Sequence, residues 1–376
     1  MEPISRLTAA LKPLIRLGMH THPLAKIDLS AILSNWQALG KLSAPGKAGA
    51  VVKANAYGHG ARQVSQILAK AGCETFFTAT TEEAIDVRKA VGSAPEILVF
   101  NGIPDQKADL AKTHRLTPII NTLHQLRGWR MQGLGETGPA VLHFDTGMNR
   151  LGLRPEDLPA VKEMLDGSSV GIVMSHLACA DEPDTRLNAE QRTAFIELSA
   201  HWPEARKSLA NSAGLALDGG AYAFDLSRPG IALFGGGVPM PAGGPQVVPA
   251  LTLEAPILSV FMAPKGSSTG YGATRRFGRI HRLATVAIGY ADGFPRAASN
   301  HGFAYIGGQR CKVVGRVSMD LTTLDVTDLT CPVAPGMMVE FIGANAQLEA
   351  QACEARTLGY ELLTGLGPRV ERIWNG

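Results

Sequence analysis

Residues 50–60 read AVVKANAYGHG and join a buried strand to a lysine. The apolar run 50–52 is typical of a strand inside a parallel sheet, Lys53 follows it directly, and a loop begins at Gly58. A lone lysine at a strand edge usually extends its ammonium group into water. In α/β folds, however, ligands bind at the carboxyl ends of the strands. Desolvation there would lower the lysine pKa and make the amine a nucleophile toward carbonyl groups.

Outward from this segment, short β-rich runs alternate with longer amphipathic stretches, which is the signature of repeated βα units. We therefore expect an α/β chain whose N-terminal domain, residues 23–247, is a (β/α)8 TIM barrel. The link between Ser212 and Asp225 is short for a full helix. The expected strands are Ala50–Ala54, Thr75–Thr80, Glu96–Asn101, Leu116–Asn121, Ala140–Thr146, Val170–Leu177, Lys207–Asn211 and Leu226–Phe234.

The pattern changes after the Pro- and Gly-rich stretch VPMPAGGPQVVP at residues 238–249. Short strands separated by Gly and Asp turns follow, with one late helix, so residues 248–376 are predicted to form a mostly-β domain. The first residues, 1–22, are predicted to be an N-terminal extension. Their apolar pattern is interrupted by charged residues and a proline, which argues against a secretion signal.

Composition narrows the function classes. The chain has 376 residues, a net charge of +3 from 36 basic and 33 acidic residues, and no long charged run, so we expect no nucleic-acid partner and no membrane partner. Its five cysteines are widely spaced, with no C-x-x-C pair, which argues against a disulfide framework and against a zinc site. We therefore predict a cytoplasmic enzyme without a bound metal.

Polar residues follow several of the expected strands at the end where a barrel has its active site. Singly, each has an ordinary structural explanation as a cap or a surface charge; together they fit pyridoxal 5'-phosphate. Lys53 would bind its aldehyde, and donors after strands seven and eight would bind its phosphate. The polar residues are Lys53, Tyr57, Asp145, Asn149, Arg150, His176, Asn211, Ser212 and Arg228, and the backbone amides near Gly230 and Ile231 add further donors.

Arg228 would face the pyridine nitrogen in this arrangement. Because arginine stays protonated, it would leave that nitrogen unprotonated and weaken the electron sink. A weaker sink suits an enzyme that must return a proton to carbon without losing the amine or the carboxylate.

The chain resembles the alanine racemases, pyridoxal phosphate enzymes with an N-terminal barrel and a C-terminal β domain. The resemblance runs from about Ala25 to Arg372. It is carried by VVKANAYGHG, DTGMNRLG, SHLACAD, NSAG, RPGIALFG, TGYGATRRF, IGYADGFPR and GRVSMDLTTLDV, which occur in this order.

The resemblance implies a homodimer that interconverts L-alanine and D-alanine, either supplying D-alanine for peptidoglycan or degrading it. Lys53 would be one base, and Tyr271 from the partner subunit the other. Tyr57, His176, Asn211, Ser212, Arg228, Gly230 and Ile231 would surround the cofactor, with His176 also bonded to the tyrosine base. The residues expected at the substrate or its entry are Arg150, Tyr290, Met319 and Asp320.

Two positions depart from the family pattern. His143 stands where many members have a lysine, often carbamylated, that positions the residue matching Arg150. Another anion, a water molecule or the imidazole itself would then position Arg150. Pro368 stands where the family often has a tyrosine that touches the phosphate and crowds the substrate side chain. The proline therefore leaves open a broader amino-acid racemase.

Other classes use a lysine in a similar way. A decarboxylase of the same fold is expected to place an acidic residue opposite the pyridine nitrogen, where this chain has Arg228. A non-catalytic carrier built on one barrel would not need Tyr271. A Schiff-base aldolase without cofactor would leave the phosphate donors unexplained.

Overall fold

A computed structural model describes residues 20–237, 244 and 246–376, so most of the predicted N-terminal extension lies outside the described residues. The described chain forms two compact units. Asp28–Ala250 and Trp374–Gly376 make a barrel unit, whereas Leu251–Ile373 and the residues just before Asp28 make a β-rich unit. No helix in the described residues is both long and apolar enough to span a membrane.

The barrel unit contains a parallel sheet whose strands follow one another in chain order from β3 to β9. Both faces of this sheet are covered, and for this reason its strands are short apolar runs without polar alternation; Phe76 and Phe77, neighbours in β4, are both buried. The strands are β3 (Ala50–Val51), β4 (Thr75–Thr78), β5 (Glu96–Val99), β6 (Thr117–Ile120), β7 (Ala140–His143), β8 (Val170–Met174) and β9 (Arg206–Ser208).

Two short strands close the ring, which confirms the predicted barrel. β10 (Leu226–Ser227) pairs in parallel with β2 (Lys47–Ala48). The Arg228 amide donates to Ala210 O at 2.9 Å, and the Val51 amide donates to Pro229 O at 3.0 Å, so the segment after β10 bonds to both neighbours. The predicted eighth strand was too long. Ile231–Phe234 is a 3-10 turn, because Pro229 has no amide hydrogen to continue the ladder.

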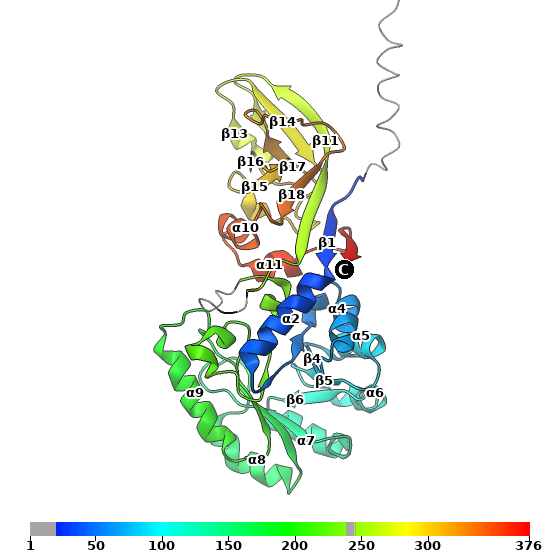
Figure 1. Cartoon of the computed structure of the whole chain (residues 1–376), viewed down its shortest axis with the longest axis vertical. Coiled ribbons are helices and arrows are strands. Elements are labelled where there is room, and N and C mark those ends of the chain that lie inside the picture. Colours follow the sequence, from blue (N-terminus) through cyan, green and yellow to red (C-terminus); the bar gives the residue numbers. More distant parts are fainter. Residues whose placement is uncertain (1–19, 238–243, 245) are drawn as a thin grey trace, which may run out of the picture. The chain divides into compact units, whose positions relative to one another are not determined.

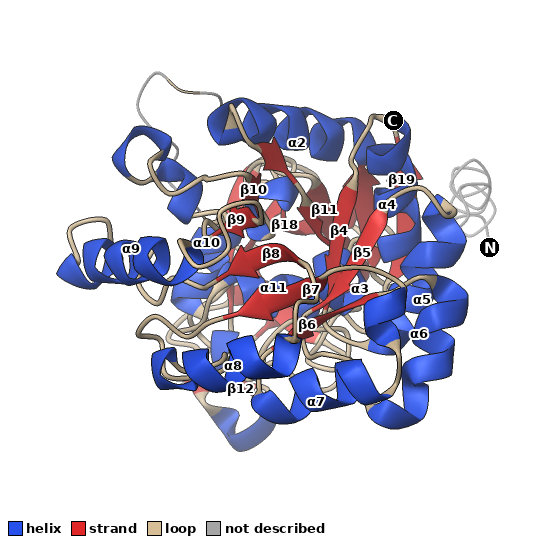
Figure 2. Cartoon of the chain, turned by 90° about the horizontal axis from the view of Figure 1, so that it is seen from below, coloured by secondary structure: helices blue, strands red, loops and turns tan. Residues whose placement is uncertain are grey.

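Helices follow the strands and lie outside them, as Figure 2 shows for α4 to α9. Their starts carry local signals: Thr80 caps α5 and Glu83 completes a capping box, while Thr122 caps α7. The helices are α2 (Leu29–Ser43), α4 (Ala61–Lys70), α5 (Thr81–Val91), α6 (Ala108–His114), α7 (Leu123–Met131), α8 (Leu158–Leu165) and α9 (Arg186–Ser199).

The β-rich unit is built around the long strand β11 (Leu251–Ala263), which pairs with β1 (Leu24–Asp28), β14 and β18 (Figure 1). The strand Leu24–Asp28 precedes the barrel in sequence but pairs with this later sheet. The remaining elements are β12 (Ser268–Thr269), β13 (Arg275–Arg276), β14 (His281–Val286), β15 (Phe303–Ile306), β16 (Gln309–Val313), β17 (Thr322–Asp325), β18 (Met338–Ile342), α10 (Leu348–Glu354), α11 (Gly359–Thr364) and β19 (Glu371–Asn375).

Candidate active site

Lys53 begins a short left-handed turn, α3 (Lys53–Tyr57), immediately after the buried strand β3. The predicted strand Ala50–Ala54 is therefore too long, since Ala54, Asn55 and Ala56 have φ values of 51°, 54° and 53°. Non-glycine residues in this conformation cost about 1–2 kcal/mol each. Backbone bonds from Ala56 N to Val52 O (2.9 Å) and from Gly58 N to Ala54 O (3.0 Å) stabilise the turn.

The loop after the turn is also held by specific contacts. Asn55 Oδ1 accepts the Ala61 amide at 2.9 Å, which ties the turn to the start of α4. Trp374 donates its indole N–H to His59 O at 2.8 Å. A strained turn with this many fixed contacts presents Lys53 at a defined position at the carboxyl end of β3.

Lys53 is half-buried, and its amine lies 5.4 Å from the centroid of the Phe100 ring. Burial is the main reason that its pKa is lower than the ordinary 10.5; the charge of Arg150 lowers the pKa further and that of Glu83 raises it. A lowered pKa increases the neutral amine fraction near pH 7, and only the neutral amine attacks a carbonyl or accepts a proton.

Arg228 is a buried cation, with 2% of its surface exposed. Its guanidinium donates to Ser208 Oγ at 2.6 Å and to the backbone oxygens of Ser175 (2.5 Å) and Leu209 (3.1 Å). Burial lowers its pKa to about 9, so it remains charged at neutral pH. No carboxylate within the described residues forms an ion pair with it, which leaves its charge available to an electron-rich ligand atom.

His176 lies beside Arg228, whose Nη2 is 3.5 Å from its Nδ1. Burial, followed by the charges of Arg228 and Arg150, holds the His176 pKa well below 6.5. The imidazole is therefore neutral at pH 7, and its Nδ1 accepts from Arg228 in the tautomer that carries the proton on Nε2. The charge of Lys53 also lowers the His176 pKa, so Arg150 and Lys53 both lie within electrostatic reach of this histidine.

Tyr57, Ser212 and Gly230 meet near the ends of β9 and β10. Ser212 Oγ accepts the amides of Gly230 at 2.9 Å and Ala232 at 3.2 Å. A side chain at position 230 would put its Cβ 2.3 Å from the Tyr57 hydroxyl, so only glycine allows this approach. Buried Ile231 follows Gly230 and starts the 3-10 turn. This polar cluster has the donor groups that a phosphate requires.

Asn211, also predicted to contact the cofactor, uses its side chain locally. Its Oδ1 accepts the Gly214 amide at 2.8 Å, which caps the turn that follows. In this structure Asn211 therefore acts as a cap. Its side-chain amide nitrogen takes no part in that hydrogen bond.

Arg150 is exposed at the end of the loop that follows β7. Asp145, nearly buried, organises this loop: its Oδ1 accepts the amides of Gly147, Met148 and Asn149 at 2.9, 2.9 and 3.1 Å. Asp145 therefore supports the loop that carries Arg150 and belongs to the scaffold of the site.

His143, at the end of β7, is 8% exposed and lies 2.7 Å from Asn121 Oδ1 through its Nδ1. Burial, together with the charge of Arg228, lowers its pKa to about 4. A neutral imidazole donates its Nδ1 proton to Asn121 and carries no negative charge for Arg150. Asn121, like Phe100 and Glu83, was not predicted as a site residue from the sequence.

Four predicted site residues lie in the β-rich unit. Tyr271 is 73% exposed, at the tip of the hairpin formed by β12 and β13. Tyr290 and Met319 lie on adjacent segments, since the Tyr290 amide donates to Ser318 O at 3.1 Å. Asp320 pairs with Arg369 at 2.7 Å, and Arg369 also pairs at 3.0 Å with buried Asp292.

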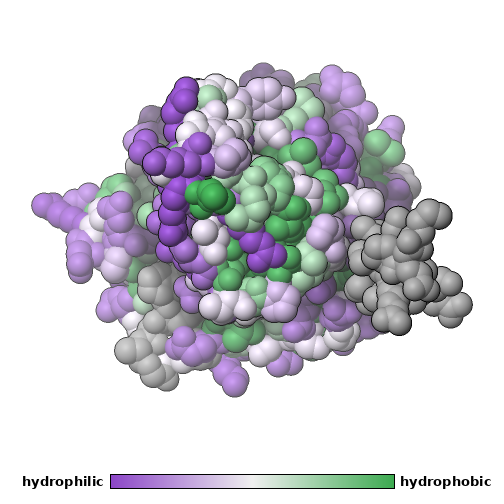
Figure 3. Space-filling model, turned by 90° about the horizontal axis from the view of Figure 1, so that it is seen from above, coloured by the Kyte–Doolittle hydropathy of each residue, from purple (hydrophilic) through white to green (hydrophobic). Residues whose placement is uncertain are grey.

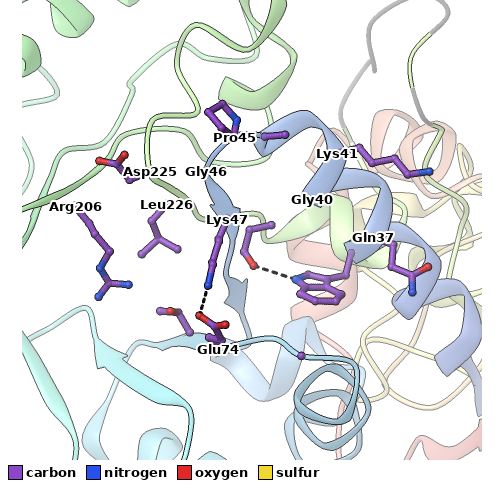
Figure 4. Close-up of a pocket in the computed structure, with 15 residues that line it drawn as sticks. Gln37, Gly40, Lys41, Pro45, Gly46, Lys47, Glu74, Arg206, Asp225 and Leu226 are labelled. Atoms are coloured by element: carbon purple, nitrogen blue, oxygen red, sulfur yellow. Dashed lines mark hydrogen bonds and ion pairs between the residues drawn. The ribbon is translucent and has the colours of Figure 1, made fainter.

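A cavity of about 950 Å³ opens at the other end of the barrel strands (Figure 4). Lys47, Thr75, Arg206 and Leu226, which line it, are the first residues of their strands, whereas Lys53 follows the end of one. Its polar groups are largely paired, as with the Lys47–Glu74 ion pair at 2.6 Å. The chemistry-bearing residues are therefore not those that line this cavity.

Comparison with known proteins gives one consistent result. Residues 27–238 match the family model "Alanine racemase, N-terminal domain", and residues 250–374 match "Alanine racemase, C-terminal domain". A protein of Acidiphilium cryptum named "Alanine racemase" is 45% identical, covering 94% of this chain and 98% of its own. One of Agrobacterium fabrum named "Alanine racemase, catabolic" is 42% identical, covering 93% and 91%.

Solved structures agree with these sequence matches. The alanine racemase of Bartonella henselae "with covalently bound pyridoxal phosphate" has a TM-score of 0.87 and 35% identity, covering 94% of this chain and 99% of its own. The "biosynthetic alanine racemase" of Pseudomonas aeruginosa has a TM-score of 0.87 and 36% identity, with the same coverage.

Proposed function

Because this chain belongs to the alanine racemase family, we propose that it interconverts L-alanine and D-alanine by moving the Cα proton between Lys53 and Tyr271 of the partner subunit. The chain is an isomerase, and its cofactor is pyridoxal phosphate. One observation carries the proposed residue roles. Lys53 has a lowered pKa, and its charge and that of the buried cation Arg228 both act on His176.

The residues present in the barrel unit fit this cofactor. Lys53 would hold its aldehyde, and Arg228, a buried cation without a carboxylate partner in the described chain, would face its ring nitrogen. The close approach of Gly230 to Tyr57, with Ser212 beside it, suits a phosphate. When bound, the cofactor delocalises the electron pair that remains after Cα loses its proton.

Racemisation requires a proton donor and a proton acceptor on opposite faces of the same carbon. Lys53, with its lowered pKa, is suited to accept a proton on one face. Tyr271 would serve on the other face, and its 73% exposure at a hairpin tip leaves its hydroxyl able to enter a second subunit's site. His176 would bond to that hydroxyl and to Arg228.

Substrate binding would fall to Arg150 and to three residues of the β-rich unit. The Arg150 guanidinium would bind the alanine carboxylate, because its geometry allows two parallel hydrogen bonds. The Met319 amide would bind the same group, Asp320 would support it, and Tyr290 would line the entry. Met319 and Tyr290 are 53% and 44% exposed, so both are open to a partner.

A homodimer would supply these residues to each site. Figure 3 shows apolar side chains gathered on one face of the molecule. In the β-rich unit, Leu258, Phe261, Met262 and Ile280 are between 43% and 61% exposed. Exposed large apolar side chains of this kind are typical of surfaces that a protein partner covers.

A broader amino-acid racemase is the second candidate. Pro368 favours it, because a tyrosine that would crowd the substrate side chain is absent at this exposed position. Biosynthetic and catabolic roles both use the same reaction, and the similar proteins named above include each kind.

Circular dichroism of the pyridoxal phosphate-loaded protein tests the reaction. L-alanine and D-alanine, in separate samples, should both decay to the same zero signal. Lys53→Ala should abolish the decay and the absorption band of the bound cofactor. The same assay with serine and with lysine measures the breadth of the substrate range. If the cofactor band changes on adding alanine while neither signal decays, racemisation is excluded and a non-catalytic carrier, or a decarboxylase that does not act on alanine, is favoured.

A further inference from the structure

We propose that Glu83 is a positioning residue for Lys53: its carboxylate holds the left-handed turn that carries the lysine and places a negative charge near the amine. This inference rests on the proposed function of Lys53. Glu83 touches neither substrate nor cofactor in this proposal and acts through the turn and through its charge.

The two carboxylate oxygens of Glu83 connect separate segments. Oε1 accepts the Ala54 amide at 2.7 Å, on the residue that follows Lys53. Oε2 accepts the amide of Ala79 at 2.8 Å and that of Thr80 at 3.4 Å. Because Ala79 and Thr80 follow β4 and Ala54 follows β3, one side chain joins the carboxyl ends of two neighbouring strands.

The Ala54 amide needs this acceptor. Ala54 has φ 51° and ψ 49°, which directs its amide out of the strand ladder that ends at Val52. A turn in this conformation is strained and persists only when its surroundings hold it. Charged acceptors make the stronger hydrogen bonds, so a carboxylate is well suited to this position.

A second helix in the same barrel shows that capping alone does not require a charge. At α7, Thr122 is the cap and Gln125 takes the position that Glu83 has in α5. Gln125 Oε1 accepts the Asn121 amide at 2.7 Å, while its Nε2 donates to Asn101 O at 2.8 Å. Glutamine has one acceptor and one donor. At α5 both ends of the side chain face amides, and only a carboxylate accepts at both.

The charge of Glu83 also acts on Lys53. Burial and Arg150 lower the Lys53 pKa, whereas Glu83 raises it, so the carboxylate limits the shift. Removing the charge should lower the Lys53 pKa further. The position of the turn and the titration of the lysine should therefore change together when the carboxylate is neutralised.

Glu83→Gln tests the proposal, with Glu82→Gln as the matched control. Glu82 lies on the same first turn of α5 but is exposed and pairs with Lys107. The measurement is the pH titration of the absorbance band of the cofactor bound to Lys53, together with kcat. In Glu83→Gln the titration should move to lower pH, and kcat should fall by roughly tenfold to a hundredfold.

Glu83→Asp keeps the charge on a shorter side chain. The titration of this variant should stay near that of the unaltered protein, while kcat should fall. This result would distinguish the effect of the carboxylate charge from the effect of its position on the turn. If Glu83→Gln does not fold, an Asp variant with unchanged titration and unchanged kcat would overturn the proposal. So would a folded Glu83→Gln that behaves like Glu82→Gln. An unaltered protein that forms no cofactor band or does not racemise alanine would instead contradict the proposed function.

Discussion

His143 is buried near Arg150, and its side chain is uncharged at neutral pH. Its pKa of about 4 follows from burial, and its Nδ1 is bonded to Asn121. A histidine of this kind has a thermodynamic cost at low pH, because the unfolded chain can bind a proton that the folded chain excludes.

The pH dependence of stability should reveal this cost. Between pH 6.5 and about 4 the unfolded His143 is protonated and the folded one is neutral, so stability falls as pH falls through this window. From pH 7.5 to pH 5 this residue should account for a loss of about 2 kcal/mol in the free energy of unfolding. Urea unfolding at both values should show a smaller loss in His143→Gln. Equal losses in the two proteins would contradict the assignment.

Tyr271→Phe should distinguish proton exchange on the two faces of the substrate. The phenol oxygen is removed while the exposed ring stays, so the proton that the tyrosine transfers should exchange about 10²–10⁴ times more slowly. Proton NMR in D2O can follow the loss of the Cα hydrogen from L-alanine and D-alanine in separate samples. One enantiomer should still exchange, through Lys53. Equal slowing of both would exclude a two-base scheme.

At the scale of elements, the sequence pattern predicted most strands but not their ends. The apolar runs and Thr caps are local signals, and they located β3 to β9 and the helices between them. The left-handed turn at Lys53–Tyr57 has no local signal beyond Asn55. Its conformation depends on Glu83, which lies on another helix, and a contact of this kind cannot be read from periodicity.

The segment that carries Tyr290 makes a close backbone contact with the segment that carries Met319. A Cβ at buried Gly289 would lie 2.3 Å from Ser318 O and 2.4 Å from Met319 O. Gly289→Ala should therefore push the two segments apart, lower the free energy of unfolding by about 1–3 kcal/mol and raise KM for alanine. Gly278→Ala is the control, since its Cβ would meet nothing within 4 Å. Similar thermal unfolding and KM in both variants would show that the contact is not tight.

At the scale of the whole molecule, the sequence predicted a barrel and a β-rich unit, and it predicted cofactor or substrate roles for nine residues of the first and four of the second. The location of Lys53, His176 and Arg228 at one end of the barrel follows from one rule, that parallel strands end at the same side. The pairing of Leu24–Asp28 with β11 does not follow from such a rule, because it joins segments more than 200 residues apart. The role proposed for Tyr271 depends on a second copy of the chain.

Mixed dimers provide the test of shared sites. Lys53→Ala and Tyr271→Phe subunits should each have little activity alone. A heterodimer contains one Lys53→Ala subunit and one Tyr271→Phe subunit. If each site takes Lys53 from one subunit and Tyr271 from the other, one site carries both substitutions and the other site carries neither. The purified heterodimer should then have about half of the unaltered activity, because one of its two sites is intact. If Tyr271 served the site of its own chain, every site would keep one substitution, and mixing would restore nothing. Racemisation rates after co-expression with two different affinity tags, on the purified doubly tagged dimer, distinguish these outcomes.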